Sequence, residues 1–311
     1  SDVLEVINAC DSGREGELIF RLVYYYSKCQ KPMKRLWISS MEDSAIVDGF
    51  KNLRDGKEFD NLYKSALARS QADWIVGINA TRLFTVLYNQ LLSAGRVQTP
   101  TLALIVNREE DIRSFRKEKF YHLDLYLDGF MASSERIKEK DEANELKNLC
   151  IGEMAIAKDV TKQKKNVNPP LPFDLTSLQR EANRLFGYTA KQTLDYTQSL
   201  YEKKWVTYPR TDSRYLTDDM MESLINLING IDKDNLVENP NYKRILDSKK
   251  VTDHHAIIPT IQSLNMNIED IPKTEKNIYN LICLKLLEAV ADTYEEEIVT
   301  VSLLVGAKIF T

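Results

Sequence analysis

A strand, a turn and a helix follow one another at the N-terminal end, and this order limits the possible folds more than any other feature of the sequence. Residues 3–7 have the apolar, β-branched character of a strand. After the turn at 11–13, the apolar residues of 18–26 recur with helical spacing. A second strand is predicted at 35–39 and a short helix at 43–52. The pattern indicates half of a parallel α/β unit, and we expect further strands before it because a complete unit has more.

The rest of the sequence predicts helical domains separated by β segments. Residues 120–130 alternate apolar and polar side chains, as in a half-buried strand. Residues 205–208 are expected to form a short strand after two helices, which is the layout of a winged-helix-like module. Helices are predicted at 61–92 (one helix or two), 99–113, 176–186, 190–203, 218–229 and 274–293, and a last β segment at 297–305. The predicted fold class is therefore multi-domain, α/β plus α+β.

Length and composition fit a multi-domain protein without a membrane span. At 311 residues, with 43% hydrophobic and 28% charged residues, the chain is long enough for two or three domains and too apolar for a disordered protein. The net charge of −4 argues against a protein that coats nucleic acid by bulk charge, although local basic patches can follow phosphates. The sequence contains no run of about 18 apolar residues, so no membrane-spanning helix is predicted. The four cysteines are too widely spaced to predict a zinc site or a disulfide framework, and we expect a cytoplasmic protein.

The first candidate site is the acidic turn at 11–17. Asp11 and Glu15 follow the first predicted strand, at the edge where open α/β sheets bind ligands. Their carboxylates could share a hard divalent cation such as Mg²⁺. The pattern Ser12-x-x-Glu15 is also typical of a capping box at a helix start, and the two roles are compatible.

The second candidate is the segment 206–213, which contains Tyr208 and Arg210. In an extended chain, residues two apart point to the same side, so the phenol and the guanidinium would lie together. A guanidinium stabilises a nearby phenolate and holds a phosphate through several donors, which suits attack on a phosphodiester. On spacing alone, a Tyr208 packed against the core with Arg210 on a solvated turn is the more common arrangement.

Two further groups of residues carry weaker signals. His254 and His255 are adjacent, and a histidine can donate to a phosphate or shuttle a proton near neutral pH. Neighbouring residues of a strand face opposite ways, so this pair would make a poor metal site. Along or just after the helical segment 61–92 lies a row of side chains that could bind a single strand or form an ordinary solvated face: Arg69, Asp73, Arg82, Arg96 and Gln98.

Five motifs in this order resemble the type IA DNA topoisomerases, most of all the topoisomerase III branch. They are Asp-Ser-Gly-Arg-Glu-Gly-Glu at 11–17, Leu-Ser-Ala-Gly-Arg-Val-Gln-Thr-Pro-Thr-Leu at 92–102, Pro-Pro-Leu-Pro-Phe at 169–173, Thr-Tyr-Pro-Arg-Thr-Asp-Ser at 207–213 and His-His-Ala-Ile-Ile-Pro-Thr at 254–260. Because the motifs extend over most of the chain, together they outweigh the simpler interpretation of each one alone.

The resemblance implies a role for each candidate residue. Tyr208 would be the nucleophile, Arg210 its partner on the scissile phosphate and His254 a histidine near the active site. Asp11 and Glu15 would bind Mg²⁺, and Glu15 would also take part in catalysis. The positions that contact the entering single strand would be Arg69, Asp73, Arg96 and Gln98. The family pattern is usually Asp-x-Asp-x-Glu, and Gly13 stands where the middle acid would be. We therefore expect weaker metal binding, by two acids or with help from Glu17.

The resemblance also implies the order of domains. It assigns 1–56 to the C-terminal part of a Toprim (Rossmann-like) domain, 57–117 to a helical DNA-binding domain, 118–168 to a β hinge or gate segment, 169–262 to a winged-helix-like domain that carries the tyrosine, and 263–311 to a return helix and a second β hinge segment. Family members have a catalytic Glu and a Lys before the point where this chain starts, and their gate continues beyond its end. We therefore expect an incomplete and weakly active fragment.

The implied reaction is transesterification. Tyr208 would attack a phosphate, stay attached to the 5′ end and release a 3′ hydroxyl; after passage of another strand, reversal would reseal the DNA without ATP. The substrate would be single-stranded segments of negatively supercoiled or catenated DNA. No membrane would be involved, and the sequence does not identify a partner helicase. Two alternatives stay open: a single-stranded DNA-binding module without cleavage, and another Toprim enzyme, a primase or nuclease, in which the Tyr208 segment has no role.

Overall fold

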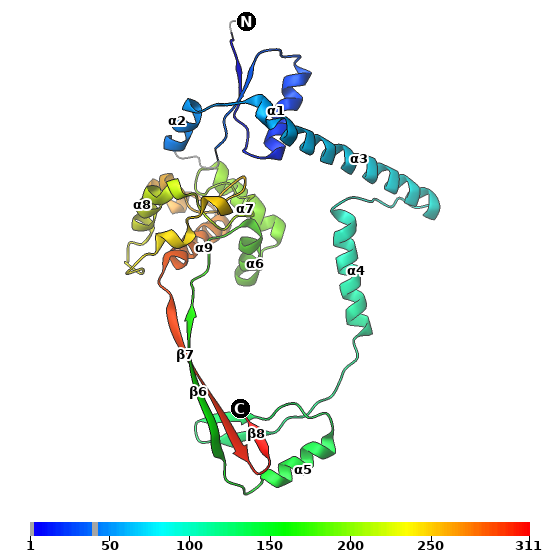
Figure 1. The fold of residues 1–311 in the computed structure, drawn as a ribbon, viewed down its shortest axis with the longest axis vertical. Helices are drawn as coiled ribbons and strands as arrows, with labels where there is room; N and C mark the ends of the chain where they lie inside the picture. The colour runs from blue at the N-terminus through cyan, green and yellow to red at the C-terminus, as the bar shows by residue number, and fades with distance from the viewer. Residues whose placement is uncertain (1–2, 39–42) are drawn as a thin grey trace. The chain divides into compact units, whose positions relative to one another are not determined.

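The chain folds into two compact units, each built from two stretches that are far apart in sequence. The computed structural model describes residues 3–38 and 43–311 (Figure 1). Unit 1 combines Ser1–Gly95 with Asn168–Asp292, and unit 2 combines Arg96–Val167 with Thr293–Thr311. The boundary after Gly95 falls inside the segment 57–117 that was expected to be one domain. The five domains expected from the sequence therefore stay a prediction.

The N-terminal part of unit 1 is a small α/β unit. In its sheet, β1 (Val6–Asn8) pairs in parallel with β2 (Met33–Arg35), and β2 pairs antiparallel with β3 (Arg54–Asp55). The helix α1 (Arg14–Tyr26) connects the two parallel strands, as the sequence predicts.

The predicted second strand at 35–39 is wrong in its bounds. The strand β2 ends at Arg35, and beyond it the Leu36 N–H makes one more hydrogen bond, of 3.0 Å, to the Asn8 carbonyl. Residue 39 lies outside the described residues.

The helix α1 buries a charged face. Its apolar side chains at Ile19, Leu22 and Val23 are exposed, whereas Glu17 and Arg21 point inward and are buried. The apolar spacing predicted the helix correctly. The face that packs is set by ion pairs with residues outside the helix.

The helices α2 (Asp43–Lys51) and α3 (Asp60–Tyr88) complete this part of unit 1. A short 3-10 turn, η1 (Gly56–Phe59), precedes α3 and begins with a capping box made by Asp55 and Glu58. The predicted helical segment 61–92 is thus a single helix of 29 residues, and of its side chains that of Ala66 alone is buried.

Helices and short 3-10 turns form the rest of unit 1. Capping boxes start two of the helices at Asp174 and Thr189, and Gly187, with a φ of 70°, ends the first. The elements are α6 (Leu175–Phe186), α7 (Ala190–Glu202), η2 (Asp218–Met220), α8 (Met221–Ile231), η3 (Tyr242–Ile245), η4 (Ser248–Lys250), η5 (Ile261–Asn265), η6 (Ile268–Asp270) and α9 (Lys273–Val290). The four helices predicted for this region are confirmed with small shifts at their ends.

Two hydrophobic clusters hold these helices, and the segment around His254 runs between them. Val206 and Ile257 belong to the first cluster, with residues of α6, α7 and α9. Ala256 and Ile258 belong to the second, with residues of α8 and the end of α9. Because successive side chains enter different clusters, the position of this segment is fixed from both sides.

Unit 2 is built mainly from strands. A hairpin joins β4 (Asp124–Leu127) to β5 (Phe130–Ser133) through a two-residue turn in which Gly129 has a φ of 87°. The predicted strand at 120–130 is therefore shorter than expected, but its alternation is confirmed, since Leu123, Leu125 and Leu127 pack on the core. The other elements are α4 (Gln98–Ser114), α5 (Lys140–Cys150), β6 (Ile156–Val167), β7 (Tyr294–Val305) and β8 (Lys308–Phe310), and the last three form an antiparallel sheet. In the residues that the structure describes, every helix is either too short or too polar to cross a membrane.

Candidate active site

The acidic loop after β1 is held by the guanidinium of Arg35. Nη1 of Arg35 donates to the carbonyl oxygens of Cys10 (2.7 Å) and Asn8 (3.0 Å), and Nη2 donates to the Asp11 carbonyl. A methyl group at Gly16 would come within 3.0 Å of the Asp11 backbone nitrogen and carbonyl carbon, so the loop can fold this tightly only with glycine there. These contacts fix the backbone from which the Asp11 side chain extends.

The buried carboxylate of Glu17 contacts Arg35, which holds the loop, and is not available to a metal. Its carboxylate accepts hydrogen bonds from Asn8 Nδ2 and Arg21 Nε, both at 2.8 Å, and lies 3.3 Å from Arg35 Nε. Burial lowers the pKa of Arg35, and the negative charge of Glu17 is the largest effect that raises it again. The expectation that Glu17 helps to bind a metal is wrong, because its charge is already used inside the fold.

The capping box expected from Ser12 and Glu15 is absent. The N-cap of α1 is Gly13, without a side-chain cap. Ser12 Oγ instead donates to the Ile38 carbonyl (2.6 Å) and accepts from the Ile38 N–H (3.0 Å), while Glu15 forms an ion pair of 2.7 Å with Arg69. Both side chains therefore link the loop to neighbouring elements.

The tyrosine segment does not form the predicted strand at 205–208. Val206 makes a single bridge with Pro259, and the Thr207 N–H donates to the Ile258 carbonyl at 2.9 Å. Farther along, Thr211 Oγ1 donates to the His254 carbonyl at 2.8 Å. The two motif segments are thus joined along their length, which brings Tyr208 to His254.

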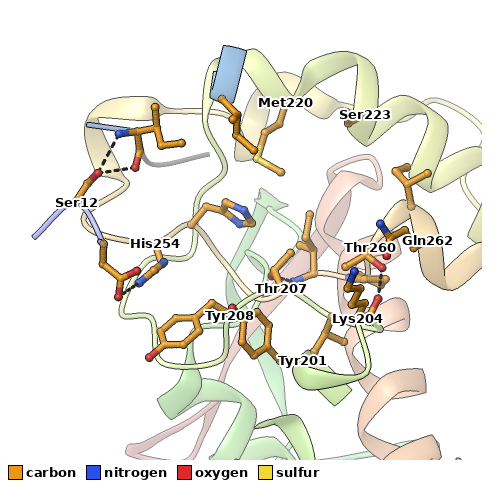
Figure 2. Close-up of a pocket in the computed structure, with 18 of the residues that line it drawn as sticks. Ser12, Tyr201, Lys204, Thr207, Tyr208, Met220, Ser223, His254, Thr260 and Gln262 are labelled. Atoms are coloured by element: carbon orange, nitrogen blue, oxygen red, sulfur yellow. Dashed lines mark hydrogen bonds and ion pairs between the residues drawn. The ribbon is translucent and has the colours of Figure 1, made fainter. Parts of the chain in front are cut away.

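Tyr208 and His254 lie close together in the wall of a cavity (Figure 2), and Asp11 also lines this cavity. The ring centroids of Tyr208 and His254 are 4.3 Å apart, and Tyr201 packs edge-on against Tyr208 at 5.3 Å. His254 Nε2 lies 3.6 Å from Asp11 Oδ2, a distance that gives an ion pair when the imidazole is protonated. Residues predicted from three different motifs therefore meet in one place.

The adjacent histidine has a different role. His255 is buried, and its Nδ1 lies 2.8 Å from the Ala256 carbonyl oxygen. Burial lowers the pKa of His255. The two imidazoles face different ways, as expected of neighbouring residues: His254 lies against Tyr208, whereas His255 is buried, although both line the cavity.

Asp253 brings another carboxylate to the acidic loop. Its carboxylate carbon and Oδ1 lie 2.6 Å and 2.7 Å from the point that a Cβ of Gly13 would occupy. Desolvation raises the pKa of Asp253; His254 opposes this shift, and the charges of Asp212 and Asp11 add to it. Nothing in the local sequence predicts this approach, because Gly13 and Asp253 are far apart in the chain.

The cavity extends from this cluster along α8. Its volume is about 1050 Å³, and its wall combines the Asp11 loop with side chains of Tyr201, Lys204, Leu224 and Gln262. The wall thus mixes charged and polar side chains, such as Asp11, Lys204 and Gln262, with apolar ones such as Leu224, which suits a ligand with both charged and apolar parts.

The remaining predicted site residues lie apart from this cluster. Arg210 is exposed and does not line the cavity that Tyr208 lines. Asp73 is half-buried on α3, one turn after Arg69. Arg96 and Gln98 are exposed at the start of α4 in unit 2. Of the DNA-binding residues expected from the sequence, Arg69 contacts a predicted site acid, Glu15, at 2.7 Å.

The donor set fits Mg²⁺ only as a loosely held ion. In the described part of the chain, no three acidic, histidine or cysteine side chains converge closely enough to hold a metal by themselves. Mg²⁺ commonly uses one or two carboxylates and keeps several waters. The Asp11 carboxylate, which is 56% exposed, meets this requirement, and that of Glu15 is shared with Arg69.

Comparison with known proteins identifies the family. The profile of the DNA topoisomerase family matches residues 57–311. This chain belongs to the DNA topoisomerase family. Topoisomerase relatives of high similarity include DNA topoisomerase 3 of Bacillus licheniformis, 42% identical over 327 aligned positions, and that of Bacillus subtilis, 41% identical over 328. Each alignment covers 100% of this chain and 45% of the relative, so the chain spans about half the length of the curated relatives it matches.

A solved topoisomerase has the same architecture. Full-length topoisomerase I of Thermotoga maritima superposes with a TM-score of 0.73 at 28% identity, over 96% of this chain and 51% of that one. The resemblance to type IA topoisomerases of the topoisomerase III branch, predicted from five motifs, is confirmed, and so is the mixed α/β fold class.

Proposed function

We propose that this topoisomerase chain carries the site that cleaves and rejoins one DNA strand, with Tyr208 as the nucleophile. The observation that supports it is the meeting of Tyr208 with His254 at 4.3 Å and of His254 with Asp11 at 3.6 Å. A core tyrosine would not need a histidine and an exposed carboxylate beside it in the wall of a cavity.

The reaction is an exchange of phosphodiesters. The Tyr208 hydroxyl oxygen forms a bond to phosphorus while the bond from phosphorus to the 3′ oxygen breaks. The phenolic proton is lost, and the released 3′ oxygen gains one, so no water is consumed and the reverse step rejoins the strand. His254 donates a hydrogen bond to a phosphate oxygen, and Arg210 on its exposed turn holds the DNA backbone.

The acidic loop and the basic helix face have supporting roles. Mg²⁺, when bound, would neutralise phosphate charge near the site. Asp11 and Glu15 would hold it, and the Arg69–Glu15 ion pair of 2.7 Å orients the second of these acids. The entering single strand would contact Arg69, Asp73, Arg96 and Gln98. Such local contacts are needed because the net charge of −4 does not attract DNA to the chain as a whole.

The proposal extends to the substrate and the setting. Single-stranded segments of negatively supercoiled or catenated DNA would be the substrate, since a nucleophile in the wall of a cavity is reached more easily by an unpaired strand than by a duplex. The Bacillus relatives favour the bacterial cytoplasm as the setting. The Toprim part at 1–56 and the winged-helix-like part at 169–262 would together form the site.

The deciding experiment is a cleavage assay with two labels. Single-stranded DNA labelled at its 3′ end, incubated with the chain and Mg²⁺ and then denatured, should give a slow protein-linked band, while the 5′-labelled strand should give a short free fragment. Tyr208→Phe should abolish both products. Tyr201→Phe is the matched control, because it removes a hydroxyl from the neighbouring ring and should leave them.

Other outcomes would select other functions. Cleavage that survives in Tyr208→Phe would indicate a metal nuclease. DNA that binds in a native gel without any covalent band would show that this chain binds DNA but does not cleave it, as a binding module or an incomplete active site would. Either result would overturn the proposal that this chain cleaves DNA through Tyr208.

A further inference from the structure

The space beside Gly13 is occupied by the carboxylate of another residue, and the backbone there does not require glycine. Gly13 has a φ of −158° and a ψ of 179°, an extended conformation that any residue adopts. A Cβ there would collide with the Asp253 carboxylate, whose Oδ1 lies 2.7 Å from that point. The carboxylate of Asp253 therefore fills the volume that a side chain of residue 13 would occupy.

The environment of Asp253 leaves this carboxylate ready for a cation. Among the described residues, it makes no hydrogen bond and no ion pair, although its neighbour His254 contacts Asp11. Asp11 and Asp253 both line the wall of the same cavity. Two carboxylates held near each other repel unless a proton or a cation lies between them.

We infer that Asp253 supplies the acidic site with the carboxylate that position 13 lacks, so that Asp11 and Asp253 together hold Mg²⁺. This inference rests on the proposed metal-dependent function and adds a ligand to it from a second motif. Two carboxylates with waters match the usual coordination of Mg²⁺ in proteins. Glu15 then keeps its ion pair with Arg69 and contributes charge from farther away.

The test measures metal binding directly, with Mn²⁺ as the probe. The sharp electron paramagnetic resonance signal of free Mn²⁺ disappears on binding, so a titration of the 311-residue chain yields affinity and stoichiometry without any DNA or activity. Asp253→Asn and Asp11→Asn should each weaken binding roughly tenfold or more, because each removes a charged ligand of nearly unchanged size.

Asp212→Asn is the matched control for simple electrostatics. Asp212 is exposed, accepts a hydrogen bond of 2.6 Å from Thr252, and lies near enough to affect the charge of Asp253. If Asp253 acts as a ligand, the Asp212 variant should bind Mn²⁺ within about twofold of the original chain. Equal losses in the two variants would show that only the field of nearby charges matters, and the inference would be wrong.

A pair exchange tests the geometry. Gly13→Asp alone should weaken Mn²⁺ binding or disturb the loop, since its Cβ meets Asp253. Gly13→Asp combined with Asp253→Gly should restore the binding that Asp253→Gly alone loses. Unchanged affinity in Asp253→Asn, with a loss in Asp11→Asn, would reject Asp253 and leave the metal proposal standing. Unchanged affinity in both would reject the two together.

Discussion

Replacement of Glu17 by glutamine should loosen the acidic loop from within. Glu17 is 1% exposed and lies between Arg21 and Arg35, which are 3% and 1% exposed. Glutamine keeps the size of the side chain and removes its charge, which takes the counter-ion from the buried Arg35, while Arg21 keeps its ion pair of 2.7 Å with Asp60. Breaking a buried ion pair from one side costs about 3–5 kcal/mol.

The lower end of this range already has a measurable effect. About 3 kcal/mol corresponds to a roughly hundredfold larger opening constant, since each 1.4 kcal/mol is a factor of about ten. Hydrogen exchange followed by mass spectrometry should show this increase in peptides from β1, the Asp11 loop and α1. Because Arg35 also holds the Cys10 and Asp11 carbonyls, the loop should exchange faster together with the helix.

Glu58→Gln provides the comparison for a surface pair. Glu58 binds Arg54 at 2.7 Å with both side chains 48% exposed, and glutamine can keep the hydrogen bond to the Asp55 N–H. Such pairs contribute about 0–1 kcal/mol, so exchange should change little. If Glu17→Gln changed exchange no more than Glu58→Gln does, the buried network would not support the loop and the reasoning would be refuted.

Three other predictions concern stability and reactivity. Gly77→Ala should stabilise the chain by about 0.5–1 kcal/mol, measured by urea unfolding, because an added Cβ on this helix meets nothing nearer than 3.5 Å. Burial raises the pKa of Cys283 to about 12, so this thiol should resist a thiol reagent at about pH 8 in the folded chain and react once the chain is unfolded; rapid native labelling would contradict this. Burial lowers the pKa of His255, so the unfolded chain binds its proton more readily and stability should fall as the pH decreases from about 7 to 5. The same titration on His255→Gln should show a smaller fall, and an unchanged slope would exclude His255 as its origin.

The sequence predicts best the features that depend on neighbouring residues. The predicted start of α7 at Thr189 and the predicted end of α6 at Gly187 both agree with the structure. Both depend on local effects, namely side-chain capping and the left-handed conformation of glycine. The alternation around Leu125 likewise identifies the side of the strand that packs on the core. In each case the signal and the structure lie within a few residues of each other.

Features set by distant contacts could not be predicted in this way. Ser12 and Glu15 have the spacing of a capping box, but Ile38 and Arg69 offer them other partners. The common face expected for Tyr208 and Arg210 assumes a strand, and the pairing of this segment with 254–260 yields only an isolated bridge at Val206. Family motifs indicated which residues matter; the contacts that position them depend on tertiary structure.

The geometry also connects metal binding with closure of the site. Tyr208 and His254 are fixed by the hydrophobic clusters that Val206 and Ile257 enter, whereas Asp11 belongs to a loop fixed by Arg35. At the site itself, the ion pair between these two parts is the 3.6 Å contact of His254 with Asp11, which needs a protonated imidazole. A cation held by Asp11 and Asp253 would join the same two parts without that requirement. Metal binding should therefore hold the nucleophile and the acidic loop together through the two carboxylates.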